Sequence, residues 1–386
     1  MEQLAVADDG IGERVDAVVE RAIAERRIVG AVLMVSVSGR SIYERAAGAA
    51  DREHGRATRL DTIFRWASLT KPVVAATTLA LEESGVVSLD DPVTKHLPDF
   101  RPRLPNGETP TVTVRHLLTH TAGLTYGFLE ADDGPYHRAG ISDGRDIPGR
   151  SIDDNLARIN SVPLSYPPGS AWGYSVALDV LGEFIARAAR TPLPQLVRDL
   201  VTGPLGMSDS GFTVADRERL AAPYGDGSPE PERMRDHHVV PFGLAKISFA
   251  PDRMFDPASF PSGGSGMSGT AADFLRLLET LRAGGAPILS PRSVNLLATI
   301  ATGDLRTLYP GFGFSLGWSV LADPSRTGTP QSPGTWAWGG VYGNSWFVDP
   351  AKGLSVVVLT NTAVAGMTGA FPNAVRDAIY ASLRTR

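Results

Sequence analysis

Residues 66–76 read WASLTKPVVAA, and this stretch is the most informative part of the chain for predicting the fold. Proline is tolerated in the first turn of a helix but not in its interior, so Pro72 predicts a helix that begins near Ser68. The apolar residues that follow, towards Glu83, predict that this helix is buried. Ser68 and Lys71 are three residues apart and should therefore share one face of it.

A serine and a lysine in this placement are candidates for covalent catalysis. Only four of the 37 basic residues are lysines, and a buried lysine can release its proton at useful pH whereas an arginine cannot. Free N–H groups at a helix start suit an oxyanion, and Lys71 could take the proton of the Ser68 hydroxyl. The structural alternative is that Ser68 caps the helix and that Lys71 lies on a solvated face.

Strand patterns occur at both ends of the chain, with helical patterns between them. We predict an α+β fold in which the two ends pair in one antiparallel sheet flanked by helices. Residues 1–90 and 310–386 would form this domain, and residues 91–309 would form a mostly helical domain, with the active site between the two. The expected strands are 30–37, 42–47, 314–321, 335–339, 345–348 and 354–359, and the expected flanking helices are 11–27 and 366–383.

Composition argues against several classes of protein. The chain of 386 residues carries a net charge of -5 without a block of like charge, which makes nucleic acid and membrane surfaces poor partners. It lacks cysteine, which excludes disulfides, thiolate metal sites and a cysteine nucleophile. No apolar run is long enough to span a membrane. The start, MEQL, lacks the basic and apolar parts of a secretory signal, which predicts a cytoplasmic location. The oligomeric state stays open.

Histidine spacing offers a metal-site alternative. His116 and His120 are four residues apart, as in a zinc-protease pair, but no glutamate follows His116 and no third ligand is suggested by position. We therefore expect hydrogen-bonded histidines, no metal and no cofactor.

A second serine motif competes with the first. Residues 313–317 read GFSLG, which matches the Gly-x-Ser-x-Gly elbow of α/β-hydrolases. That elbow needs a strand, a sharp turn and a helix, whereas residues 311–321 resemble one continuous strand. The motif also needs a histidine after the serine, and the last histidine is His238. We attribute the match at Ser315 to chance.

Further motifs fall in a characteristic order around Ser68-Leu69-Thr70-Lys71. They are LLTHTAGL at 117–124, PGSAWG at 168–173 followed by Tyr174-Ser175, and Trp338-Gly339-Gly340. Over essentially its whole length the chain resembles the β-lactamase/transpeptidase-like fold of serine β-lactamases and penicillin-binding proteins, class C branch. Its motifs are most similar to those of family VIII carboxylesterases.

The resemblance implies a role for each motif. Ser68 would accept the acyl group, and Lys71 and Tyr174 would act as a coupled base–acid pair. A phenol is a poor base at neutral pH unless a neighbouring cation stabilises its phenolate. The residues Trp338, Gly339 and Gly340 would line the site from a strand, where glycines allow close approach. The N–H groups of Ser68 and Val341 would form the oxyanion hole.

Two departures from the β-lactamase pattern bear on the substrate. Trp338 replaces the lysine that would pair with a lactam carboxylate, and Val176 replaces the asparagine two residues after Tyr174. Both remove polar recognition, which favours a neutral ester over a charged lactam. Tyr126, in the segment 125–150, is expected to line the site under a cap.

The predicted function is a serine carboxylesterase that hydrolyses short-chain esters through an acyl-enzyme, with a small-molecule ester as its only expected partner. The alternatives are an acyltransferase on the same fold, a weak β-lactamase or D-Ala-D-Ala peptidase, and a catalytically silent ligand sensor.

Overall fold

A computed structural model describes residues 5–6, 10–243 and 245–384. Its centre is an antiparallel sheet of eight strands in the order β11-β12-β13-β14-β15-β2-β3-β4. β15 pairs with β2, so the C-terminal strands join the N-terminal ones as predicted, with Val357 opposite Met34. The strands are β11 (Phe312–Phe314), β12 (Ser319–Leu321), β13 (Trp336–Gly340), β14 (Asn344–Asp349), β15 (Leu354–Thr360), β2 (Gly30–Val37), β3 (Arg40–Asp51) and β4 (Arg56–Ala57).

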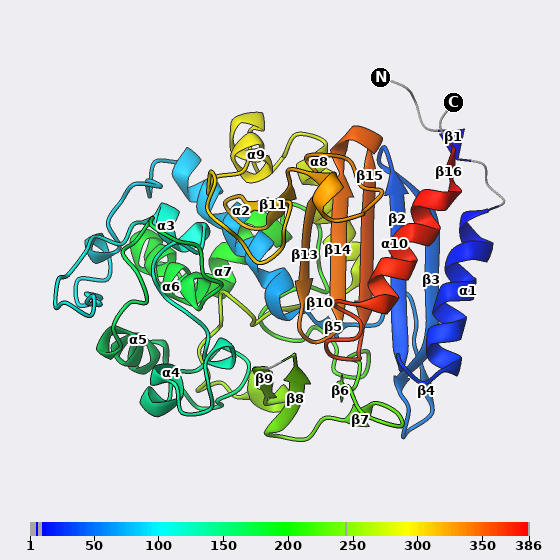
Figure 1. Cartoon of the computed structure of the whole chain (residues 1–386), viewed down its shortest axis with the longest axis horizontal. Helices are drawn as coiled ribbons and strands as arrows, with labels where there is room; N and C mark the ends of the chain where they lie inside the picture. Colours follow the sequence, from blue (N-terminus) through cyan, green and yellow to red (C-terminus); the bar gives the residue numbers. More distant parts are fainter. Residues whose placement is uncertain (1–4, 7–9, 244, 385–386) are drawn as a thin grey trace.

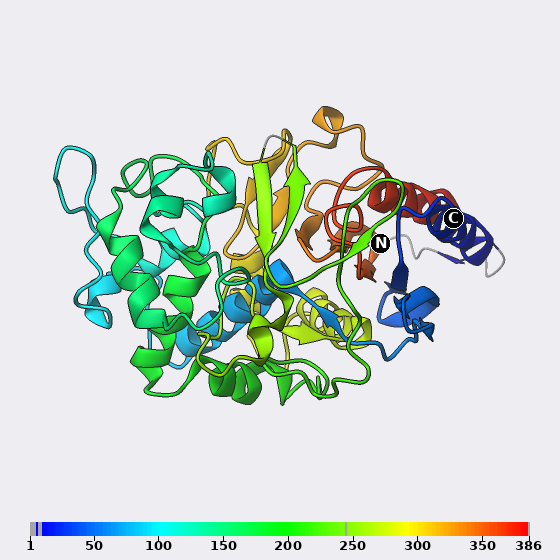
Figure 2. The ribbon, with the colours of Figure 1, turned by 90° about the horizontal axis from the view of Figure 1, so that it is seen from below.

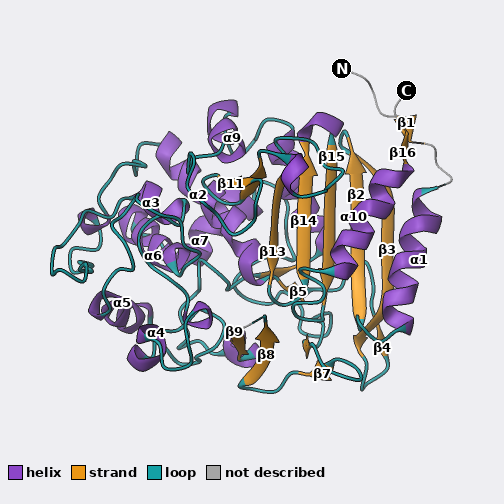
Figure 3. Ribbon diagram, viewed as in Figure 1, coloured by secondary structure: helices purple, strands orange, loops and turns teal. Residues whose placement is uncertain are grey.

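Helices cover both faces of the sheet because its central strands are apolar on both sides. α1 (Ile11–Ala24) and α10 (Ala370–Ser382) pack together on one face (Figures 1 and 3). Val356 and Val358 of β15 point into the core beneath these two helices. Val357 and Leu359 alternate to the opposite face, where α8 (Ala271–Arg282) packs on β2 and β15.

α2 (Thr70–Glu83) runs from the edge of the sheet into the helical region, where α6 (Ala177–Ala189) and α7 (Leu193–Val197) pack against it (Figure 1). The β8–β9 hairpin stands between this region and the sheet (Figure 2). The elements of this part are α3 (Val114–Leu118), α4 (Pro135–Ala139), α5 (Ile152–Ser161), α6 (Ala177–Ala189), α7 (Leu193–Val197), α9 (Pro291–Ala298), β8 (His238–Phe242) and β9 (Ala245–Phe249). Short pairs are formed by β5 (Phe64–Arg65) with β10 (Ser268–Gly269), β6 (Tyr224–Gly225) with β7 (Glu232–Arg233), and β1 (Ala5–Val6) with β16 (Leu383–Arg384).

The predicted α+β class with an antiparallel sheet is confirmed, and two local predictions need correction. Residues 311–321 are a hairpin of β11 and β12, not one strand, because the Ser315 hydroxyl donates to the Trp318 carbonyl (3.1 Å) and closes a tight turn. The segment at Ser68 begins as a 3₁₀ turn (Ala67–Leu69), and the α-helix starts only at Thr70.

Candidate active site

The side chains of Ser68, Lys71 and Tyr174 converge on one oxygen atom. The Lys71 Nζ donates to the Ser68 Oγ at 3.0 Å, and the Tyr174 hydroxyl donates to the same atom at 2.6 Å. Lys71 is fully buried and Ser68 is 6% exposed. The structure therefore brings Tyr174 to the Ser68–Lys71 pair, although 106 residues separate this tyrosine from Ser68 in the sequence.

Backbone geometry presents the serine. Ala67, immediately before it, has φ of 47°, a left-handed conformation that costs a non-glycine residue on the order of 1–3 kcal/mol. Such local strain persists only where the surroundings hold it, and here the surroundings are fully buried. Within the described part of the chain, the backbone N–H groups of Ser68 and Val341 donate no hydrogen bond. Both are thus free to receive an acceptor.

Lys71 is held from its far side by the loop at residues 262–266. Its Nζ donates to the Gly264 carbonyl at 2.8 Å. The same Nζ lies 4.7 Å from the ring centre of Tyr174 and 5.3 Å from that of Tyr126. Among the described residues no carboxylate lies within ion-pair distance of this side-chain nitrogen, so its immediate partners are a hydroxyl, a carbonyl and two aromatic faces.

A cavity of about 430 Å³ opens onto the serine. Tyr174, Trp338, Gly339 and Val341 line it around Ser68, as the motifs predict. The Trp338 ring stands against the Tyr174 ring, with 5.1 Å between centres. The outer part of the cavity is an apolar rim from three further segments, made of Phe128, Leu129, Phe242, Leu308 and Tyr309.

Three residues predicted to line the site lie outside this cavity. Tyr126 is buried behind Tyr174, with 4.9 Å between ring centres, and Phe128 and Leu129 supply the wall from the same segment. Val176 is fully buried just before α6. A Cβ on Gly340 would lie 2.2 Å from the Trp66 carbonyl, so this glycine lets β13 approach the serine-bearing turn.

Sequence reasoning also missed residues that support the site. Gly264 and Asp179 stand behind Lys71, and the rim residues Phe242, Leu308 and Tyr309 come from segments without a recognisable motif. One signal was present: Asp179 interrupts the apolar sequence ALDVLG of α6 and is only 1% exposed there. A charged group buried in a helix usually has a specific partner.

The alternative sites are occupied by structural contacts. His116 caps α3, accepting from the Thr113 N–H. His120 is completely buried, its Nδ1 lies 3.1 Å from the Ser175 Oγ, and burial holds the pKa of its imidazole well below the usual value. Ser315 is fully buried in its hairpin turn. In the described ranges no cluster of three or more His, Asp or Glu side chains is placed to hold a metal.

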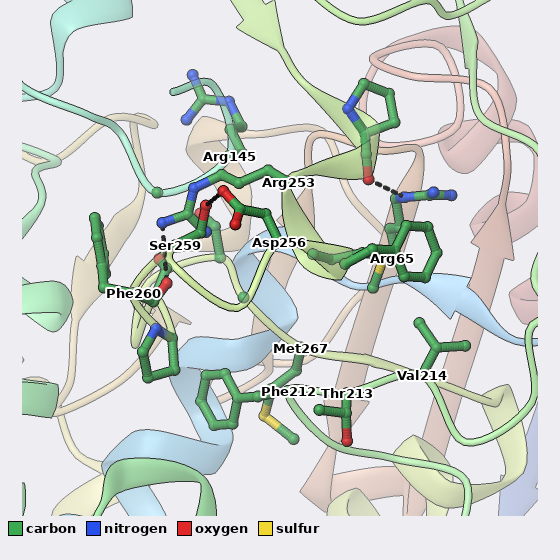
Figure 4. Close-up of a pocket in the computed structure, with 18 of the residues that line it drawn as sticks. Arg65, Arg145, Phe212, Thr213, Val214, Arg253, Asp256, Ser259, Phe260 and Met267 are labelled. Carbon is green, nitrogen blue, oxygen red and sulfur yellow. Dashed lines mark hydrogen bonds between the residues drawn. The ribbon is translucent and has the colours of Figure 1, made fainter. Parts of the chain in front are cut away.

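A second cavity, of about 330 Å³ (Figure 4), is lined in part by the loop at 262–266 and lacks the three converging groups. The buried arginines that line this second cavity donate hydrogen bonds to backbone carbonyls. Arg65 donates to the carbonyls of Pro251 and Ala221, and Arg253 donates to those of Ile147 and Phe260. Of the two cavities, only the first combines a nucleophile with groups able to move its proton.

An antiparallel sheet beside a helical region, with a serine, a lysine and a tyrosine meeting where they join, is the arrangement of the penicillin-recognising serine enzymes and their relatives. The chain belongs to the β-lactamase family, whose model, described as Beta-lactamase, matches residues 15–380. No helix among the described residues is both long and apolar enough to cross a membrane.

Similar proteins place the chain with the esterases of this family. The chain is 52% identical to Esterase EstB of Burkholderia gladioli over 379 residues, covering 96% of this chain and 95% of that protein. The solved structure of EstCE1, described as a hydrolase with promiscuous acyltransferase activity, superposes with a TM-score of 0.94 at 43% identity, covering 97% and 99% of the two chains. Simvastatin synthase (LovD) from Aspergillus terreus shares the fold at 23% identity, with a TM-score of 0.74 and 96% and 98% coverage. The predicted resemblance to family VIII carboxylesterases agrees with these findings.

Proposed function

We propose that this protein is a serine carboxylesterase that cleaves small neutral esters through an acyl-enzyme on Ser68. The observation that carries the proposal is the convergence of the Lys71 Nζ and the Tyr174 hydroxyl on the Ser68 Oγ, at 3.0 and 2.6 Å. The 52% identity to a named esterase supports the reaction class.

Two groups that can exchange a proton with the serine hydroxyl, the Lys71 Nζ and the Tyr174 hydroxyl, lie beside the Ser68 Oγ. As the Ser68 Oγ bonds to the ester carbonyl carbon, its proton passes to the Lys71–Tyr174 pair. The same pair returns a proton to the departing alkoxide, which leaves as the alcohol. A water molecule then repeats the sequence in reverse and frees the acid.

The developing oxyanion has two donors available. The N–H groups of Ser68 and Val341 donate to no other group in the described structure. Each donor placed at such a position contributes on the order of 10²–10³ in rate. This arrangement supports the predicted oxyanion hole.

The walls favour a neutral substrate. Trp338 brings an aromatic face to the position where a lysine would bind a lactam carboxylate, and Phe128 and Tyr309 continue an apolar surface outward. An anionic substrate would lose hydration here without gaining a charge partner at Trp338. Short-chain esters therefore remain our first choice of substrate.

Acyl transfer to an alcohol is the second candidate function. It differs from hydrolysis only in the acceptor that attacks the acyl-enzyme. The apolar rim is partly exposed, with Leu129 and Tyr309 at 44% and 43%, and could receive a hydrophobic alcohol. EstCE1, which is similar over the whole chain, is described as having such promiscuous activity.

Turnover of p-nitrophenyl acetate, with and without added butanol, tests both functions. We expect release of acetate in water, partial diversion to butyl acetate with butanol, and loss of both reactions in Ser68→Ala. Nitrocefin hydrolysis at a rate comparable to ester hydrolysis would contradict the substrate assignment. Full esterase activity of Ser68→Ala would contradict the mechanism.

A further inference from the structure

The position of the Lys71 side-chain nitrogen depends on one backbone carbonyl. Its Nζ donates to the Ser68 Oγ on one side and to the Gly264 carbonyl, at 2.8 Å, on the other. Since no carboxylate touches this nitrogen in the described structure, the Gly264 carbonyl is its anchor opposite the serine. Whatever fixes Gly264 therefore fixes the distance between Lys71 and Ser68.

Asp179 is the group that fixes Gly264. Its Oδ1 accepts from the Gly264 N–H at 3.1 Å and from the Ser262 hydroxyl. One glycine thus offers its N–H to Asp179 and its carbonyl to Lys71. The loop also packs directly on α6, because a Cβ at Gly263 would lie 2.3 Å from the Leu178 carbonyl. The contacts form a chain from the Asp179 carboxylate through Gly264 to the reacting atoms.

The second oxygen of Asp179 and the Tyr126 hydroxyl both lie beside Gly264. A Cβ on Gly264 would stand 3.0 Å from the Tyr126 hydroxyl and 3.2 Å from the Asp179 Oδ2. Neither of these buried atoms has a hydrogen-bond partner among the described residues. An unpaired buried carboxylate oxygen is costly, and its charge acts over a longer range than it would in water.

We propose that Asp179 is a positioning residue for the reaction of Ser68: it orients the Gly264 peptide that holds Lys71, and its charge stabilises the ammonium that forms when Lys71 takes the serine proton. This inference rests on the proposed function and adds a residue to it. In the step concerned, the Ser68 O–H bond breaks, an N–H bond forms on Lys71, and the serine oxygen bonds to the acyl carbon.

The electrostatic setting is consistent with this role. Burial raises the pKa of Asp179, while the Ser262 hydroxyl, the Gly264 N–H and the nearby Lys71 and Arg253 oppose that rise. The other titratable groups facing the lysine are Tyr126, Tyr174 and His120. Burial makes protonation of His120 and ionisation of Tyr126 unfavourable, since it lowers the pKa of the first and raises that of the second. Asp179 is therefore the acidic group best placed to balance the ammonium.

The test compares Asp179→Asn with Asp273→Asn. Asp273 of α8 is a matched control, since it is also buried, has a pKa raised mainly by burial, and accepts from a serine hydroxyl and a backbone N–H. The readout is the rate of Ser68 labelling by a fluorophosphonate as a function of pH. In this reaction the serine oxygen bonds to phosphorus and fluoride leaves, so the rate reports nucleophilic attack by Ser68 without a deacylation step. Asparagine preserves the shape and an acceptor oxygen at Asp179 while it removes the charge.

We expect Asp179→Asn to label at least tenfold more slowly than the wild type. The acidic limb of its pH profile should move to lower pH, because the charge that favours a protonated Lys71 is gone. Asp273→Asn should keep the rate and the profile of the wild type. An unchanged Asp179→Asn, or one that is slower with an unshifted profile, would overturn the proposal.

Gly264→Ala provides a second route if Asp179→Asn fails to fold. Its Cβ would press on Tyr126 and Asp179 and displace the carbonyl from Lys71, so slower labelling is expected, and wild-type labelling would contradict the inference. Failure of the wild type itself to label at Ser68 would instead refute the proposed function.

Discussion

The inner floor and the outer rim of the cavity are built in opposite ways. The floor is made of the buried Ser68 and the partly buried Tyr174, with the fully buried Lys71 directly behind them, and hydrogen bonds to one another or to the backbone hold all three. The rim is made of apolar side chains from separate loops, several of them exposed, with Leu308 at 48%. The difference indicates that the floor determines the chemistry and tolerates little change, whereas the rim selects the substrate.

The largest effect is expected at the floor. Lys71→Arg keeps a positive charge but cannot give up its proton, so kcat/KM for p-nitrophenyl acetate should fall by about 10³. KM should change little, because the ester does not need this amine for binding. A thermal melt close to that of the wild type would show that the loss is chemical. Near-wild-type turnover would show that Lys71 does not transfer the proton. It would also contradict the difference proposed between the floor and the rim.

Trp338 lies at the boundary between floor and rim, and its replacement should redirect specificity without stopping catalysis. Trp338→Lys introduces a cation that can pair with a substrate carboxylate, so the rate on nitrocefin relative to p-nitrophenyl acetate should rise about tenfold. Trp338→Leu is the matched uncharged control and should leave that ratio nearly unchanged. Equal ratios in the two variants would contradict the role assigned to the tryptophan.

The smallest effect is expected at the rim. The Asp143 carboxylate accepts from the N–H groups of Gly127 and Phe128, at 2.9 and 3.2 Å, and pairs with Arg145. Asp143→Ala should loosen the wall formed by Phe128 and raise KM severalfold while kcat changes little. Asp132→Ala, an exposed change in the same segment, serves as the control. A large fall in kcat would show that the rim also sets the chemistry.

Asp143→Ala should also change how the free energy of unfolding depends on pH. Burial raises the pKa of Asp143 to about 6, against the lowering effect of Arg145. The native state therefore binds this proton more tightly than the unfolded chain, in which the pKa is about 3.9. The contribution of this group to the free energy of unfolding is greatest below about pH 4 and falls as the pH rises towards 6. Asp143→Ala should remove this fall, as urea titrations between pH 4 and 7 would show.

The floor could be predicted from sequence because most of its geometry is local or belongs to a shared motif. Ser68 and Lys71 lie one turn apart, and Val341 directly follows Gly339 and Gly340. The role of Tyr174 was implied by the resemblance to family VIII carboxylesterases. The contacts of Asp179 and Gly264 could not be predicted, because they join residues 85 positions apart without a local pattern. The sheet was predictable from apolar runs.

The rim could not be predicted because any exposed apolar side chain can serve in it. Tyr126 and Phe128 lie two residues apart, and only tertiary packing decides that the first is buried behind Tyr174 while the second faces the cavity. The prediction of one continuous strand over residues 311–321 was wrong for a similar reason. The Ser315 hydroxyl closes a turn that the apolar pattern does not reveal.

The most direct test of the central claim is peptide mapping after reaction with a fluorophosphonate. We expect a single label, on the peptide containing Ser68, with esterase activity lost in proportion to labelling. Label on Ser315, or full inactivation with Ser68 unmodified, would contradict it.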